Sequence, residues 1–165
     1  MGTVVVVGNP KPKSRTLDAA VAVVEQVTGS PPDTVIDLAD LGAGLLDWAD
    51  ASVAEAVAQV RDARFVVVAS PTYKASYTGL LKLFLDRFSA GALAGVTVVP
   101  LMLGGGLQHA LAPEAFLRPV LSEIGASMPT RALYLLDSDA EAGFAQSPTL
   151  AEWLQTARPQ LAGRV

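Results

Sequence analysis

The sequence predicts a doubly wound α/β domain in which a five-stranded parallel sheet carries helices on both faces. Five short apolar runs alternate with five segments of helical periodicity, in the order βαβαβαβαβα. Such alternation is typical of parallel strands joined by crossover helices. The apolar runs are nearly continuous, as expected for strands buried on both faces. The chain of 165 residues has the length of one domain, and we expect residues 1–165 to form a single domain.

The expected elements follow from the spacing of apolar residues along the chain. Each expected helix repeats apolar residues every three or four positions, which places them on one face. Residues 29–33 form a short turn rather than a linker, and no internal repeat is present. The expected strands are 3–7, 34–38, 65–69, 96–103 and the weaker 131–136. The expected helices are 16–27, 53–60, 80–88, 115–124 and 149–161.

Composition excludes several classes of function. The chain has no cysteine, which rules out disulfides and thiol catalysis, and one histidine without a carboxylate cluster leaves no expected metal site. A net charge of -4 disfavours nucleic acid as a partner, because phosphate backbones require a basic surface. The apolar runs are too short to span a bilayer and no secretory signal is recognisable. We therefore expect a cytoplasmic protein that binds neither membrane nor nucleic acid.

In open parallel sheets, ligands bind beyond the carboxyl ends of the strands, so the loops after the first, third and fourth strands are the candidates. The first of these loops leads into a helix whose amino end favours an anion. Neither a Walker A loop nor a G-x-G-x-x-G motif is present, since Pro12 stands where Walker A needs glycine. A terminal monophosphate fits better, although a capped helix with solvated lysines would look the same. The candidate residues are Asn9, Lys11, Ser14, Arg15 and Thr16.

The loop after the third strand is rich in hydroxyl and aromatic groups. A flat heteroaromatic ligand needs donors at its edge and positive charge where reduction builds negative charge. The alternative is a helix-initiating turn with surface aromatics. The candidates are Pro71, Thr72, Tyr73, Lys74 and Ser76.

Three consecutive glycines, Gly104, Gly105 and Gly106, follow the fourth strand. Glycines allow a backbone to approach a flat ligand closely, although such triplets also form flexible turns. His109 follows them, as a ligand contact or as a residue of a helix start or an interface.

Residues 70–79, with the sequence SPTYKASYTG, resemble the signature of the NADPH-dependent FMN reductase family. The nearest resemblance is to flavin reductases of two-component monooxygenase systems, which are flavodoxin-like. Residues 8–10 and 14–16 resemble the family's phosphate loop, with Asn9 where a serine is common. The resemblance implies that FMN phosphate binds at the first loop and that the flavin ring lies against the loops after the third and fourth strands.

The resemblance implies an NAD(P)H-dependent FMN reductase that transfers hydride from NADPH or NADH to FMN. No side chain needs to act as a nucleophile, and we assign no catalytic residue. It also implies a homodimer or homotetramer and an FMNH2-dependent monooxygenase as partner. Relatives that serve alkanesulfonate oxygenation carry a tyrosine where Ala115 stands, which leaves the identity of that partner open.

Other functions remain open on the same fold. A flavodoxin-type electron carrier is disfavoured by the lysine-rich first loop and the mild net charge. A quinone or azo reductase with tightly bound FMN is a further alternative that the sequence does not exclude. A phospho-acceptor receiver domain is excluded, because it needs an acidic pair after the first strand, where Asn9 and Pro10 stand. The preference for NADH or NADPH stays open, as does the choice between bound and released FMN.

Overall fold

The computed structural model describes residues 2–165 and has five parallel strands in one sheet. The sheet order is β2-β1-β3-β4-β5, and each neighbouring pair is parallel. Chain order therefore reverses direction between β1 and β3, which is the switch point of the flavodoxin-like fold. The expected fold class is confirmed. The strands are β1 (Thr3–Val7), β2 (Thr34–Asp37), β3 (Phe65–Pro71), β4 (Thr97–Gly104) and β5 (Leu133–Leu136).

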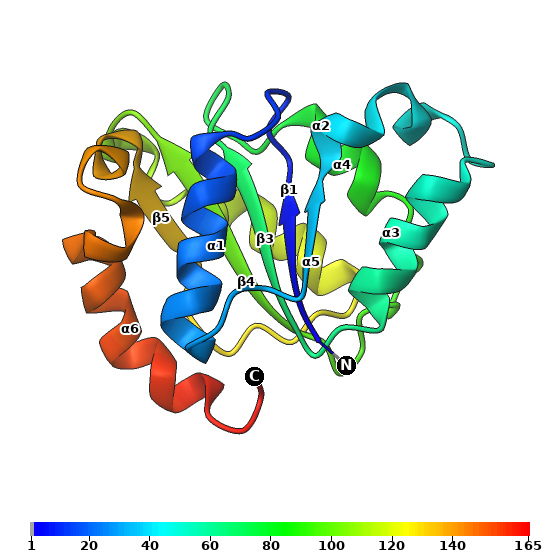
Figure 1. Cartoon of the computed structure of the whole chain (residues 1–165). Helices are drawn as coiled ribbons and strands as arrows, with labels where there is room; N and C mark the ends of the chain where they lie inside the picture. Colours follow the sequence, from blue (N-terminus) through cyan, green and yellow to red (C-terminus); the bar gives the residue numbers. More distant parts are fainter. Residues whose placement is uncertain (1) are drawn as a thin grey trace.

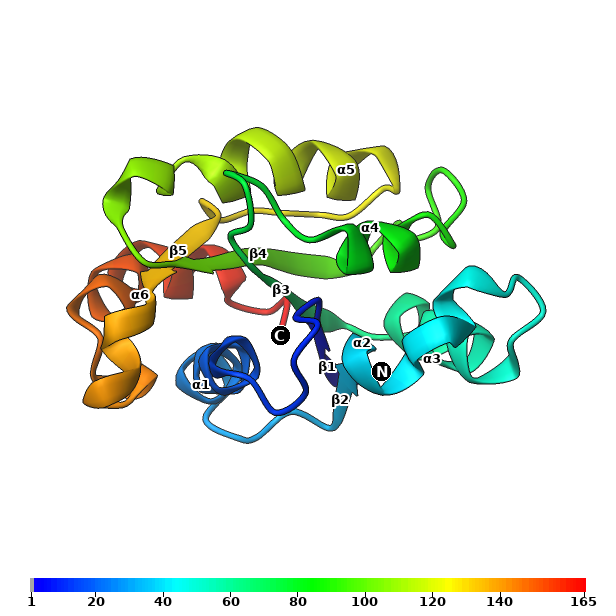
Figure 2. The same cartoon turned by 90° about the horizontal axis from the view of Figure 1, so that it is seen from above.

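Helices cover both faces of the sheet (Figures 1 and 2). Alternate residues of a strand point to opposite faces, so β1 contributes Val5 and Val7 to one apolar core and Val4 and Val6 to the other. The first core contains α1 (Arg15–Thr28) and α6 (Pro148–Leu161). The second core contains α3 (Ala51–Arg61), α4 (Gly79–Leu85) and α5 (Arg118–Glu123). Both faces of the sheet are thus buried, as the continuous apolar runs predict.

Two short helices after β2 were not expected from the sequence. The α-helix α2 (Leu38–Leu41) begins directly at the end of β2, and the 3-10 helix η1 (Gly42–Leu46) follows it. Further 3-10 turns are η2 (Leu107–His109), η4 (Asp137–Glu141) and η5 (Phe144–Gln146). Among the helices of residues 2–165, none is long and apolar enough to cross a membrane.

The helix expected at 115–124 is divided in two. Its first part is a π-helical turn, η3 (Pro113–Leu117), and its second part is α5. Pro119 has no N–H and cannot donate to the carbonyl of Ala115, as an α-helix would require. The N–H of Arg118 donates instead to the carbonyl of Pro113, five residues earlier.

Candidate functional site

Three loops meet at the carboxyl edge of the sheet, above the neighbouring strands β1, β3 and β4. We call them the first loop (residues 8–14), the hairpin loop (residues 72–78) and the glycine loop (Gly104–Gly106). The first loop begins beside β3, because the N–H of Gly8 donates to the carbonyl of Ala69 at 2.8 Å. The hairpin loop begins beside β4, where the N–H of Thr72 donates to the carbonyl of Leu103 at 2.7 Å. Figure 1 shows this edge at the top of the molecule.

The first loop ends at the amino terminus of α1. Ser14 caps this helix, and its buried side chain accepts a hydrogen bond from the N–H of Leu17. The amide of Asn9 donates to the hydroxyl of the buried Thr16 at 3.0 Å. The N–H groups of Arg15 and Thr16 belong to the first turn and have no acceptor within the helix. This end of α1 therefore offers N–H and O–H donors to an anion, beside the exposed side chains of Lys11 and Arg15.

The buried carboxylate of Asp37, at the end of β2, binds the backbone of the first loop. It accepts from the N–H of Lys13 at 3.0 Å and from the N–H of Ala39 at 3.3 Å. Lys13 has a positive φ of 51°, an uncommon conformation for a residue with a side chain. The Asp37 contact therefore helps to maintain a locally unfavourable backbone. Sequence analysis missed Asp37, although an acid that ends a buried strand is a usable signal.

The hairpin loop turns back on itself within four residues. The backbones of Tyr73 and Ser76 form an isolated antiparallel bridge, with N–H···O distances of 2.8 and 3.1 Å. Lys74 and Ala75 between them have positive φ values of 51° and 65°. Two such residues define a type I′ turn, which normally contains glycine or asparagine. Each non-glycine residue in this region costs about 1–2 kcal/mol, so the turn that presents the exposed Tyr73 and Lys74 is strained.

Two buried hydroxyls hold the two ends of the hairpin loop, and one of them also joins this loop to the first loop. The Ser70 hydroxyl donates to the carbonyl of Pro71 at 2.8 Å and accepts from the N–H of Thr78 at 3.1 Å. The Thr78 hydroxyl donates to the carbonyl of Gly8 at 2.5 Å and accepts from the N–H of Leu81 at 3.1 Å, capping α4. Neither residue was assigned a site role from the sequence. A threonine before an apolar helical segment is the signal that identifies such a cap.

The three glycines of the glycine loop have different surroundings. A Cβ atom at Gly104 would overlap the hydroxyl of Tyr134 and would lie 3.4 Å from Cβ of Thr72. A Cβ atom at Gly105 would meet no atom within 4 Å, so this residue faces open space. The carbonyl of Gly106 accepts a hydrogen bond of 2.9 Å from the Tyr134 hydroxyl. The packing of Tyr134 and Thr72 therefore requires glycine at position 104, whether or not a ligand is bound.

One polar atom between these loops makes no hydrogen bond of normal geometry within the described residues. Oγ1 of Thr72 is buried, and buried hydroxyls in proteins nearly always have a partner. It lies in the loop that follows β3, next to the glycine loop. This hydroxyl, the open space at Gly105 and the donors at the start of α1 fit a flat polar ligand that carries a phosphate.

The fourteen residues predicted from the sequence lie in the three loops, at the end of β3, in the first turn of α1 and in η2. Direct contacts join Asn9 to Thr16 and Tyr73 to Ser76. His109 ends η2, three residues beyond the glycine loop. Within residues 2–165, no three histidine, aspartate or glutamate side chains are grouped so as to hold a metal ion.

Known proteins share this arrangement of sheet and loops, which is that of flavodoxin-like proteins. The family model for NADPH-dependent FMN reductase matches residues 1–141. An FMN reductase (NADPH) of Escherichia coli K12 is 41% identical over 80 residues, which are 48% of this chain and 42% of that protein. An FMN reductase (NADPH) of Pseudomonas aeruginosa PAO1 is 32% identical over 143 residues, which are 82% of this chain and 77% of that protein.

The crystal structure of the apo form of an NADH:FMN oxidoreductase, EmoB, superposes with a TM-score of 0.82 and 33% identity. The superposition covers 98% of this chain and 90% of that protein. The matched segment spans less than half of the Escherichia coli enzyme but most of the other two proteins. The chain therefore belongs to the NADPH-dependent FMN reductase family, and the resemblance seen in residues 70–79 is confirmed.

Proposed function

We propose that this protein is an NAD(P)H-dependent FMN reductase that transfers hydride from NADPH or NADH to FMN. The observation that carries the proposal is the meeting of three loops at the switch point of the sheet. There, the N–H donors at the start of α1 lie on the same edge as the open face of Gly105 and the buried hydroxyl of Thr72, which makes no hydrogen bond of normal geometry within residues 2–165. Family membership supports the same function.

The phosphate of FMN would bind at the first loop and the start of α1. The N–H groups of the first helical turn and the hydroxyls of Ser14 and Thr16 are suitable donors. Arg15 and Lys11 would add positive charge from the solvent side, and Asn9 orients the Thr16 hydroxyl through its 3.0 Å hydrogen bond. A single phosphate matches this short loop, which contains no glycine-rich turn for a pyrophosphate.

The flavin ring would lie between the hairpin loop and the glycine loop. When bound, FMN supplies the atom that accepts hydride. The protein would position the ring and compensate charge, through the exposed Lys74 and the backbone of the strained turn. The remaining proposed contacts of the ring are Pro71, Thr72, Tyr73, Ser76, Gly104, Gly105, Gly106 and His109.

Steady-state turnover tests the proposal directly. Oxidation of NADH and of NADPH is followed by absorbance, with and without an excess of free FMN. A reductase gives many turnovers per protein with at least one nicotinamide, and a need for added FMN marks FMN as a released substrate. An electron carrier of the same fold binds FMN without sustained oxidation of either nicotinamide, and that outcome would reject the reductase.

Three further features belong to the same proposal. We propose that reduced FMN serves an FMNH2-dependent monooxygenase, as in the systems that the hairpin-loop signature resembles. We propose a homodimer or homotetramer, which the exposed apolar side chains of Leu111 and Phe116 support. We also propose that the reaction takes place in the cytoplasm.

A further inference from the structure

Tyr134 lies at the centre of β5, opposite Met102 of β4, and only 7% of its surface is exposed. It is a phenol within an otherwise aliphatic strand, LYLL. Its hydroxyl donates to the carbonyl of Gly106 at 2.9 Å. The same hydroxyl occupies the space that a side chain at Gly104 would need. Tyr134 thus contacts both ends of the glycine loop.

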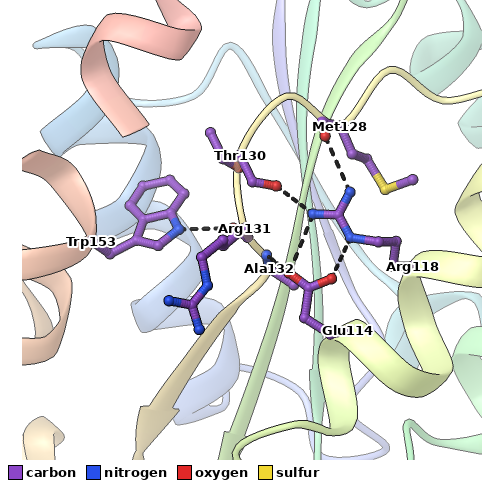
Figure 3. A network of polar contacts seen from close by, with 7 residues as sticks. All are labelled: Glu114, Arg118, Met128, Thr130, Arg131, Ala132 and Trp153. Carbon is purple, nitrogen blue, oxygen red and sulfur yellow. Dashed lines mark hydrogen bonds and ion pairs between the residues drawn. The ribbon is translucent and has the colours of Figure 1, made fainter. Parts of the chain in front are cut away.

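The segment that leads into β5 is held by side chains from both sides (Figure 3). On one side, Oε1 of Glu114 accepts from the N–H of Ala132 at 2.6 Å, and Arg118 donates to the carbonyls of Met128 and Thr130. On the other side, Nε1 of Trp153 donates to the carbonyl of Arg131 at 2.8 Å. Glu114 of η3 and Arg118 of α5 therefore hold the backbone that enters β5 from one side, and these contacts remain when the Trp153 contact from α6 is removed.

Burial raises the pKa of Tyr134, the carboxylate of Asp137 adds to the rise, and the Thr72 hydroxyl offsets part of it. A phenol is protonated at neutral pH even at its ordinary pKa, so Tyr134 is a hydrogen-bond donor there, and the rise extends this to higher pH. Thr72 begins the hairpin loop, and its Cβ lies 3.4 Å from a Cβ atom placed at Gly104. The hydroxyl end of Tyr134 and the side chain of Thr72 therefore both lie beside Gly104.

We propose that Tyr134 is a positioning residue of the flavin site, which fixes the glycine loop against the hairpin loop through Gly106 and requires glycine at position 104. This inference rests on the proposed binding of FMN at these loops. Tyr134 acts through the loop and not on the reacting atoms. Its role predicts an effect on binding of the flavin ring and no effect on binding of the phosphate.

The first experiment compares Tyr134→Phe with the unchanged protein. Loss of one hydrogen bond should lower the melting temperature by about 2–4 °C. The Kd of FMN should rise about fivefold, and the Kd of riboflavin should rise by the same factor, because the ring is common to both ligands. Trp153→Phe is the matched control. It also removes a hydrogen bond to a carbonyl beside β5, and Trp153 lines the same cavity of about 480 Å³ as Tyr134.

Trp153→Phe should lower the melting temperature at least as much and leave both Kd values unchanged. Equal Kd values for Tyr134→Phe and the unchanged protein would overturn the positioning role while leaving the reductase intact. Equal losses of affinity in Tyr134→Phe and Trp153→Phe would mean that affinity falls because the protein is less stable, and this result would also overturn the positioning role. Absence of FMN binding by the unchanged protein would reject the proposed function and this inference together.

The second experiment tests the packing without any ligand. Gly104→Ala, as a single substitution, should lower the melting temperature strongly, because the new methyl group meets the Tyr134 hydroxyl. In a protein that also carries Tyr134→Phe, Gly104→Ala should lower the melting temperature less. Part of the conflict remains, because the ring carbon Cζ lies 3.0 Å from the new Cβ. Additive effects of the two substitutions would show that Tyr134 does not determine the residue at 104.

Discussion

At the scale of single residues, Arg15 begins α1 and exposes its guanidinium beside the first loop. We expect Arg15→Ala to reduce FMN affinity by about 1.5–3 kcal/mol, the range of a hydrogen bond to a charged group. Riboflavin affinity should not change, because riboflavin lacks the phosphate. The free energy of unfolding should change by no more than about 0.5 kcal/mol, as is usual for substitutions at exposed positions. Calorimetric titration with both ligands and thermal unfolding provide these values.

Arg61 provides the control for this substitution. It ends α3 at the opposite edge of the sheet and pairs with Asp62 on the surface. Arg61→Ala removes the same charge from the protein and should leave FMN affinity unchanged. If both variants bind FMN equally weakly, the effect is one of net charge, and Arg15 has no specific contact with the phosphate.

Residues of the candidate site differ in how far the sequence could predict them. The polar residues of the first loop and the hairpin loop could be predicted because they follow apolar strands and match a family signature. Asp37 and Thr78 each carry a local signal, but their contacts with the backbones of Lys13 and Gly8 join segments distant in sequence. The same holds for the contact of Tyr134 with Gly106. The spacing of residues along the chain does not predict such contacts, because they form only when the strands lie side by side in the sheet.

At the scale of elements, one side chain connects the end of β1 to the start of α4. The Thr78 hydroxyl satisfies the carbonyl of Gly8 at the end of β1 and caps α4 through Leu81. Thr78→Val keeps the shape of the side chain and removes both hydrogen bonds. We expect the free energy of unfolding to fall by about 2–4 kcal/mol, from the lost cap and from a buried carbonyl left without a partner. Urea unfolding measures this loss.

Thr78→Ser is the control, since it retains the hydroxyl and removes a methyl group. It should recover most of the stability, because both hydrogen bonds can form. A Ser variant as unstable as the Val variant would mean that the methyl group, and not the cap, supports α4. Close packing is also present here, since a Cβ atom at Gly8 would lie 2.5 Å from Cβ of Leu81.

The order and type of the main elements followed from the sequence, whereas their bounds and the short helices did not. Apolar periodicity identifies a helix face but not a π-helical turn, which here depends on Pro119 and on the carbonyl of Pro113. The helix expected at 80–88 is formed from Gly79 to Leu85. Arg87 turns away and donates to the carbonyls of Asp47 and Trp48 in the segment between η1 and α3. The periodicity of neighbouring residues does not predict this contact, because it joins segments far apart in the sequence.

At the scale of the whole molecule, the sheet order places the ends of β1, β3 and β4 side by side. Three segments separated by about sixty and thirty residues thereby become one surface, which is a property of the fold and not of any single loop. Doubly wound alternation was sufficient to predict this edge from the sequence. A ligand that contacts all three loops should consequently stabilise the native sheet as a unit.

Ligand-linked stability tests this expectation. A ligand that binds the native state alone raises its stability by RT ln(1 + [L]/Kd), or about 2.7 kcal/mol at a hundredfold excess over Kd. For a chain of this size, such a gain corresponds to a rise in melting temperature of about 5–10 °C. FMN should produce this rise, and riboflavin at the same concentration should produce a clearly smaller one, because it does not reach the start of α1. Equal shifts with both ligands would remove the phosphate site from the proposed function, since stabilisation would then come from the ring alone.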